Sequence, residues 1–227
     1  MTYKKINIDT IKKYLEPGSV LLTSNHYSKT FIITPSPIKH GAIYFGHDIH
    51  KEINTLYNNI KLYLEYKKIN LLKPKDEIYV PEHIKYLDNI YNIIDIKKLM
   101  DKLETLKDKY NSDNDYIVEI SDKGPRILTF DKFIKNKNEI FIYHYYNKKM
   151  MKLASINSLY FLGTKYSFNK DKEGKYCFEM IIQSYEIIDK YFKSLKVSII
   201  FDSYYTSSCF TKSRYFNLVY RIIRNYY

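Results

Sequence analysis

The stretch Lys-Tyr-Cys-Phe-Glu-Met-Ile-Ile-Gln-Ser-Tyr, residues 175–185, places one of the two cysteines where a polar loop gives way to an apolar helical pattern. A thiol in the first turn of a helix lies beside unpaired backbone N–H groups and the positive end of the helix dipole, and both favour a thiolate. Cys177 is therefore the candidate nucleophile if the chain is an enzyme. The alternative is a buried cysteine that packs as a small hydrophobic residue, which is the commoner situation for an arbitrary cysteine.

The composition indicates a globular protein. The 227 residues are enough to bury a full core, and the hydrophobic fraction of 45% argues against disorder. The formal net charge of +12 would suit nucleic acid, an anionic membrane surface or an acidic substrate. Because the lysines are spread along the chain without an arginine-rich stripe, we favour a solvated basic surface and expect no specific nucleic-acid partner.

Cysteine usage and hydropathy bear on the compartment. Cys177 and Cys209 are too few for a disulfide framework or a cysteine-based zinc site, so we expect a reducing compartment. The first residues lack the apolar core of a signal peptide, and no apolar run approaches the length of a transmembrane helix. We therefore expect a soluble, cytoplasmic protein.

Hydrophobic periodicity predicts an α+β domain with an antiparallel sheet in the middle and helices on either side. The expected strands or extended elements are 20–23, 30–34, 39–46, 115–121, 126–129, 139–146 and 197–201. The expected helices outside 47–114 are 6–15, 129–134, 153–162, 176–192 and 215–224.

Residues 47–114 differ from their surroundings in showing long, charged, helical periodicity. Within them we expect one helix around 53–64, a proline-containing connector at 71–81 and one or two helices over 84–106. We interpret 47–114 as a helical insertion within a single domain spanning 1–227, serving as a lid or as a partner surface. The alternative is the helical half of an ordinary two-layer domain.

A cysteine hydrolase also needs an imidazole and a polar group that orients it. Among six histidines, His40 heads an apolar strand and is followed by Gly41, so its ring would lie at the rim of the sheet, where a helix N-terminus can face it. Glu119 interrupts the strand Tyr-Ile-Val-Glu-Ile. Alternation alone favours a solvent-facing Glu119, and burial with a partner is the other interpretation.

Four segments in order carry a resemblance. They are Leu-Glu-Pro-Gly-Ser at 15–19, Lys-His-Gly-Ala-Ile at 39–43, Tyr-Ile-Val-Glu-Ile with Gly-Pro-Arg-Ile at 116–120 and 124–127, and Leu-Gly-Thr-Lys-Tyr-Ser-Phe with Tyr-Cys-Phe-Glu-Met at 162–168 and 176–180. Together they resemble the permuted papain-like NlpC-type amidase superfamily, in particular its YiiX-like branch. That branch has poxvirus members and is distantly related to the lecithin–retinol acyltransferases. Departures from its pattern are Ser19, Lys39, Ser167 and Phe178.

The resemblance implies a circularly permuted papain-like fold with the nucleophile-bearing helix near the C-terminus. It implies Cys177 as nucleophile, His40 as general base and then acid, and Glu119 as the orienting acid. The Cys177 backbone N–H would hold the oxyanion, with Tyr166 as a candidate second donor. Such an enzyme uses no metal or cofactor and cleaves an amide, peptide or ester acyl bond through a thioester.

Two alternatives remain open. The first is a lipid acyltransferase or thioesterase that contacts an anionic membrane peripherally, suggested by the kinship and by the basic, tyrosine-rich composition. The second, from a different class, is a non-catalytic interaction protein that uses the fold as a scaffold. The poxvirus members of the branch make a viral protein acting in the cytoplasm of an infected cell one form of this alternative.

Overall fold

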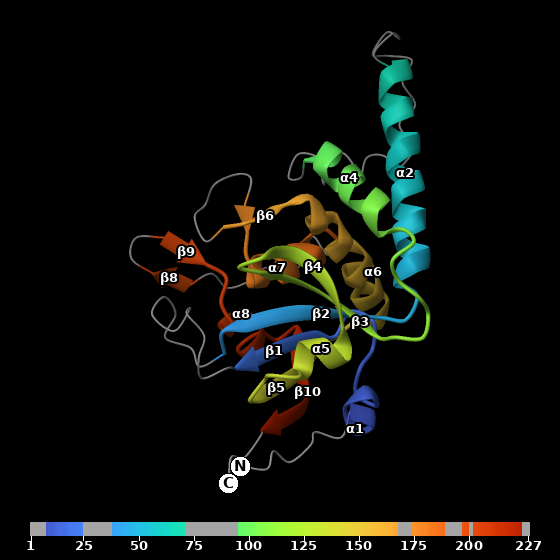
Figure 1. Ribbon diagram of the computed structural model, residues 1–227. Coiled ribbons are helices and arrows are strands. Elements are labelled where there is room, and N and C mark those ends of the chain that lie inside the picture. Colours follow the sequence, from blue (N-terminus) through green and yellow to red (C-terminus); the bar gives the residue numbers. More distant parts are fainter. Residues whose placement is uncertain are drawn as a thin grey trace.

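The computed structural model describes residues 8–24, 38–70, 95–167, 174–188, 197–199 and 202–223. Its centre is a six-stranded sheet of order β10-β5-β1-β2-β3-β4, in which every neighbouring pair is antiparallel (Figure 1). The strands are β1 (Val20–Ser24), β2 (His40–Gly46), β3 (Tyr116–Ser121), β4 (Gly124–Thr129), β5 (Glu139–Tyr145) and β10 (Phe216–Ile223). The predicted α+β fold with a central antiparallel sheet is confirmed.

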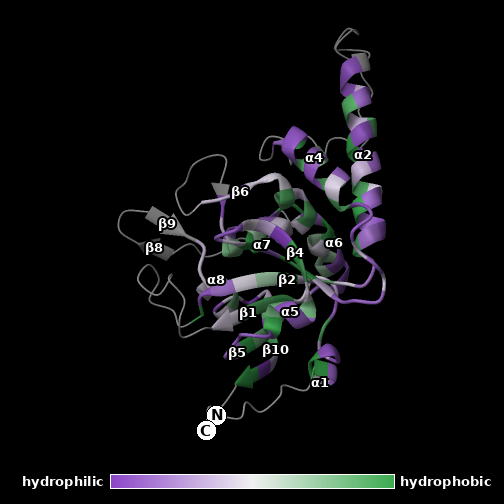
Figure 2. Cartoon of the chain, viewed as in Figure 1, coloured by the Kyte–Doolittle hydropathy of each residue, from purple (hydrophilic) through white to green (hydrophobic). Residues whose placement is uncertain are grey.

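Helices cover both faces of the sheet, because alternate strand residues point to opposite sides. Ile43 and Val118 point toward α6 (Lys148–Ser158), the 3₁₀ helix η3 (Leu159–Gly163) and α7 (Cys177–Glu186). Ala42 and Ile117 point to the opposite side, toward α1 (Ile8–Lys12) and α5 (Phe130–Ile134). The sheet therefore has a hydrophobic core on each face, and Figure 2 shows hydrophobic residues along its strands.

Two described helices connect β2 to β3. Helix α2 (Ile49–Asn70) packs against α4 (Ile96–Leu106), which in turn packs against η3, and Figure 1 shows α2 extending away from the sheet. Gly163 permits the close approach of α4, since a Cβ there would lie 2.8 Å from the backbone nitrogen of Leu99. The predicted helical character of this region is confirmed for its described residues. Its role as an inserted lid or partner surface stays a prediction.

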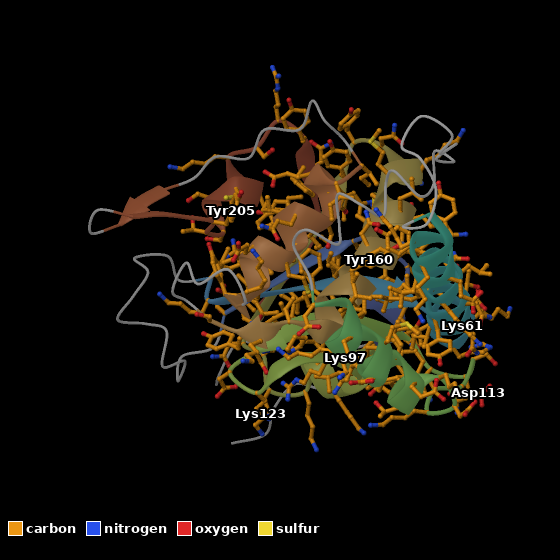
Figure 3. The ribbon with its side chains drawn as sticks, turned by 90° about the horizontal axis from the view of Figure 1, so that it is seen from above. Lys61, Lys97, Asp113, Lys123, Tyr160 and Tyr205 are labelled. Atoms are coloured by element: carbon orange, nitrogen blue, oxygen red, sulfur yellow. The ribbon has the colours of Figure 1, made fainter. Side chains whose placement is uncertain are left out.

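The helical layer has a buried interior and a charged periphery. Tyr160 of η3 is buried and lies near the middle of the view in Figure 3, whereas Lys61 and Lys123 lie toward its edge. In the described part of the chain, no helix combines the length and the apolar character that crossing a membrane requires.

Short elements surround the start of α7. Strand β6 (Lys165–Tyr166) pairs in parallel with β7 (Gly174–Lys175), which runs almost directly into the helix. Strand β8 (Val197–Ile199) pairs with β9 (Asp202–Tyr204), and α8 (Ser208–Thr211) follows. The β6–β7 pair therefore brings residues from the loop before α7 next to its first turn.

One predicted element is wrong. Residues 215–224 were expected to be helical, but they contain the strand β10, which pairs along β5 at the edge of the sheet. The run Phe-Asn-Leu-Val-Tyr-Arg-Ile-Ile is rich in β-branched and aromatic residues, and pairing with β5 satisfies its backbone groups. The helix expected at 153–162 begins earlier, at Lys148, where the Asn147 side chain caps it. The element expected at 30–34, and the part of 84–106 before residue 95, lie outside the described residues.

Candidate active site

Cys177 is the first residue of α7 and is nearly buried, with 6% of its surface exposed. Tyr176 precedes it in an extended conformation and supplies no capping side-chain hydrogen bond to the helix. Instead, the Tyr176 hydroxyl accepts a hydrogen bond of 2.6 Å from the backbone N–H of Tyr205. The thiol therefore lies where the sequence predicted it, at the positive end of an apolar helix.

Gly41 lets this helix approach the sheet. A Cβ at Gly41 would lie 2.7 Å from Cδ1 of Ile181 and 3.1 Å from Cε1 of Phe178, closer than packed side chains allow. Because Gly41 has no side chain, α7 rests directly against the start of β2. This brings Cys177 within hydrogen-bonding reach of the His40 ring.

His40 meets Glu119 across neighbouring strands. Ala42 lies directly opposite Glu119 in the β2–β3 pairing, so His40, two residues earlier, lies diagonally across on the same face. His40 Nε2 and Glu119 Oε2 are 2.6 Å apart, and the Glu119 side chain is only 2% exposed. Glu119 is thus buried with a partner, and the solvent-facing interpretation is wrong.

Arg126 holds the other oxygen of the same carboxylate. It lies directly opposite Glu119 in the β3–β4 hairpin, and its Nε donates a hydrogen bond of 2.6 Å to Glu119 Oε1. Its Nη2 is 2.5 Å from the same oxygen. The sequence analysis missed this residue although a signal was available: the turn that pairs Ser121 with Gly124 fixes the hairpin register and so puts Arg126 opposite Glu119.

These contacts shift two pKa values in opposite directions. Burial alone would lower the pKa of His40, but hydrogen bonds to Cys177 and Glu119 outweigh burial and raise that pKa to about 9. Burial likewise opposes ionisation of Glu119, yet the hydrogen bond to His40 and the positive charges of His40 and Arg126 lower its pKa to about 2. The arrangement thus favours an imidazolium paired with the Glu119 carboxylate at neutral pH.

Tyr166 also lies near the thiol. It belongs to β6, and its pKa is raised to about 12, first by burial and then by the negative charge of Cys177. The side chains of Cys177, His40 and Glu119 therefore meet, and Tyr166 lies within electrostatic range of the sulfur. In the parts of the chain that the structure describes, no group of three or more His, Cys, Asp or Glu side chains could hold a metal ion.

A family model for permuted papain-like amidase enzymes, YaeF/YiiX, C92 family, matches residues 14–206. The chain belongs to this family. The matched span contains Cys177, His40, Glu119, Arg126 and Tyr166, and the permuted papain-like, YiiX-like kinship is confirmed. No curated protein and no solved structure matches the chain significantly.

Two departures from the amidase pattern have structural explanations. Ser19 Oγ accepts a hydrogen bond from the Glu16 N–H and donates one to the Glu16 carbonyl, so it stabilises the turn before β1. Phe178 is buried against Gly41, and its ring centre lies 6.2 Å from that of Phe210, which makes it a core residue of the fold.

The other described histidines lie apart from the cluster of Cys177, His40 and Glu119. His144 Nε2 is 2.9 Å from the Tyr14 carbonyl oxygen, and His47 Nε2 is 3.0 Å from Asp115 Oδ1. His50 lies in the first turn of α2. His26 and His83 fall outside the described residues.

A second polar cluster lies at the opposite end of β2 from His40. The buried Asp115 carboxylate accepts hydrogen bonds from Tyr44 and Lys12, the latter at 2.7 Å, and contacts His47. These four residues are among those that line a cavity of about 410 Å³. Because Asp115 is fully paired within the fold, the cluster joins α1, β2 and the start of β3, and we assign it a structural role.

Proposed function

We propose that this family member is a cysteine hydrolase in which Cys177 is the nucleophile, His40 the general base and acid, and Glu119 the residue that orients and charges the imidazole. One observation carries the proposal: the His40 ring lies 2.6 Å from the Glu119 carboxylate and next to Cys177, which contributes to its raised pKa, although the three residues come from α7, β2 and β3. Acyl transfer by a cysteine needs a thiol next to an imidazole and the imidazole next to a carboxylate. A chance contact between two side chains would not produce this order of three groups.

In the proposed reaction, the Cys177 thiolate attacks the carbonyl carbon of an amide, peptide or ester bond and forms a tetrahedral oxyanion. The His40 imidazolium gives its proton to the leaving amine or alcohol as the carbon–heteroatom bond breaks, which leaves a thioester and a neutral imidazole. His40 then takes a proton from water, the resulting hydroxide attacks the thioester, and Cys177 departs as a thiolate with a carboxylic acid product.

The oxyanion would be stabilised by the Cys177 backbone N–H at the start of α7 and by the Tyr166 hydroxyl. Both support the proposal by position, the first through the helix N-terminus and the second through its electrostatic contact with Cys177. Removing one such donor typically reduces the rate on the order of a hundredfold or more.

The nucleophile can be tested before a substrate is known. Wild type, Cys177→Ala and Cys209→Ala are treated with a thiol-reactive acyl or alkylating probe and analysed by intact mass. Cys209 is the matched control, since it is also a free, buried cysteine. We expect Cys177→Ala to lose the label and Cys209→Ala to keep it. Equal labelling of both variants would refute the assignment.

The proposed chemistry requires a thiol that stays reduced. A reducing compartment such as the cytoplasm would keep the Cys177 thiol reduced, and we propose it as the place of action.

A further inference from the structure

A lysine that the sequence analysis did not single out borders the site. Lys137 lies in the turn between α5 and β5, where its backbone N–H donates to the Ile134 carbonyl at 3.2 Å. The next N–H, of Asn138, donates to the Ser24 carbonyl of β1 at 3.2 Å. The turn is therefore fixed to the sheet next to β2, the strand that begins with His40.

The side chain of Lys137 turns toward the triad. Its Nζ lies 5.0 Å from the centre of the Phe133 ring, and that ring lies 6.1 Å from the ring of His40. Phe133 is thus a common neighbour of the ammonium and the imidazole. The ammonium also interacts electrostatically with Glu119 and Cys177.

Within the described part of the chain, no carboxylate forms an ion pair with the Lys137 ammonium, although Glu119 acts on it electrostatically. Its Nζ makes no hydrogen bond or ion pair with a residue in the described ranges. The contact that the structure gives it there is the cation–π contact with the Phe133 ring. Half-burial lowers the pKa of Lys137, because a desolvated ammonium without a partner is costly. A nearby ligand anion would remove that cost.

The charges around the thiol do not balance. With the site ionised, the negative charges are those of Cys177 and Glu119, whereas His40, Arg126 and Lys137 are positive. In the acyl-enzyme, both Cys177 and His40 are neutral, and the surplus of one positive charge persists. The site therefore favours an anionic ligand before and after acylation.

We propose that Lys137 binds an anionic group of the substrate, so that the acyl compound cleaved at Cys177 carries a carboxylate or phosphate near its scissile bond. This inference rests on the proposed function, because it assumes that the substrate reaches Cys177.

Two alkylating reagents that differ in charge test the inference. Iodoacetate is anionic and iodoacetamide is neutral, and both transfer a two-carbon group to a thiolate with loss of iodide. The readout is the ratio of their rates at Cys177. We expect Lys137→Met to lower the iodoacetate-to-iodoacetamide ratio on the order of tenfold, the size expected when one charge is removed from a partly buried site. Lys137→Arg should retain most of the ratio.

Lys135→Met is the matched control, because Lys135 lies two residues away on an exposed position and should leave the ratio unchanged. The iodoacetamide rate itself shows whether the triad of each variant is intact. If Lys137→Met slows both reagents equally, Lys137 acts only on the thiol and the inference is overturned. Failure of both reagents to label wild-type Cys177 would instead overturn the nucleophile, and the inference with it.

A protection experiment distinguishes the two sources of the anion. Cys177 is alkylated with iodoacetamide in the presence of N-acetylglutamate or of glycerol 3-phosphate. Protection that depends on Lys137 is expected from at least one of them, the carboxylate indicating a peptide-like substrate and the phosphate a lipid-like one. Equal protection of wild type and Lys137→Met by both compounds would contradict the inference.

Discussion

Replacing Glu119 by glutamine should lower the pKa of His40 and destabilise the fold, with the largest loss at mildly acidic pH. The substitution keeps the shape of the side chain but removes the charge that faces His40 Nε2 and Arg126 Nε, each at 2.6 Å. Because Glu119 is buried and only one-fifth of the His40 side chain is exposed, solvent screens this pair weakly. The effect should therefore be larger than that of a surface ion pair.

The size of the effect follows from the raised pKa of His40, about 9 against an ordinary 6.5, to which Cys177 and Glu119 both contribute. An adjacent carboxylate typically accounts for about 1–2 pH units of such a difference, so the variant should titrate lower by that amount. At 1.36 kcal/mol per pH unit this corresponds to about 1.5–3 kcal/mol of lost imidazolium stabilisation. Arg126 adds little, since 37% of its side chain is exposed.

The pH dependence has a definite sign. The raised pKa of His40 stabilises the folded state below its ordinary value of 6.5, and this stabilisation disappears as pH rises through about 9. The lowered pKa of Glu119 stabilises the fold above 4.5, and this contribution disappears as pH falls through about 2. Glu119→Gln should therefore lose most stability between pH 4.5 and 6.5 and converge toward wild type in strong alkali.

NMR titration of isotopically labelled histidine measures the pKa directly, with the His40 signal assigned from its absence in His40→Gln. Denaturant unfolding across the pH range measures stability. Glu139→Gln is the matched control, because Glu139 likewise accepts from an arginine, Arg221, but its other partner is the Ser24 hydroxyl and it lies two strands from β2. If Glu119→Gln leaves the His40 midpoint at the wild-type value, the carboxylate does not charge the imidazole and the reasoning fails.

Two further variants separate catalysis from folding. Tyr166→Phe should leave the alkylation of Cys177 unchanged, because alkylation forms no oxyanion. It should slow the turnover of an acyl probe on the order of a hundredfold. Equal turnover rates in the variant and the wild type would show that Tyr166 takes no part in the mechanism. Asp115→Asn should cost about 1–3 kcal/mol in denaturant unfolding, because the amide keeps one acceptor oxygen but removes the buried charge that pairs with the partly exposed Lys12, while Cys177 still labels. Loss of labelling in a folded Asp115→Asn protein would show that this cluster is coupled to the site.

The sequence was sufficient for the local parts of the site. Cys177 at a helix start and His40 at the head of an apolar strand follow from patterns within a few residues. Arg126 was also within reach, since the β3–β4 hairpin is local and its two-residue turn fixes the register. What local patterns could not provide was the pairing of β2 with β3, across the long segment that contains α2 and α4. Only the resemblance connected His40 with Glu119.

The wrong helix at 215–224 and the missed Lys137 have a common physical origin, because tertiary contacts decide both features. Residues 215–224 can place apolar side chains at helical spacing, but the edge of β5 offers backbone partners to an extended chain, and Tyr220 stacks on Tyr14 at 4.1 Å. Propensity alone cannot anticipate such an edge. Nothing in the sequence was a reason to select Lys137, because it is one lysine among many in a lysine-rich chain. The structure distinguishes it by its cation–π contact with Phe133 and its electrostatic interaction with Cys177.

The order of charges across the sheet explains why the same carboxylate serves both folding and the proposed chemistry. Arg126, Glu119 and His40 alternate in sign, with Arg126 partly in solvent at one end and the imidazolium, next to Cys177, at the other. An inner member of such a series has opposite charges on both sides, so its removal leaves two unpaired charges, whereas removal of an end member leaves one. Glu119 is the inner anion, and a neutral residue there would remove at once the partner of the buried imidazolium and that of Arg126. The buried acid in the strand Tyr-Ile-Val-Glu-Ile is therefore tolerated because it stabilises cations on two adjacent strands.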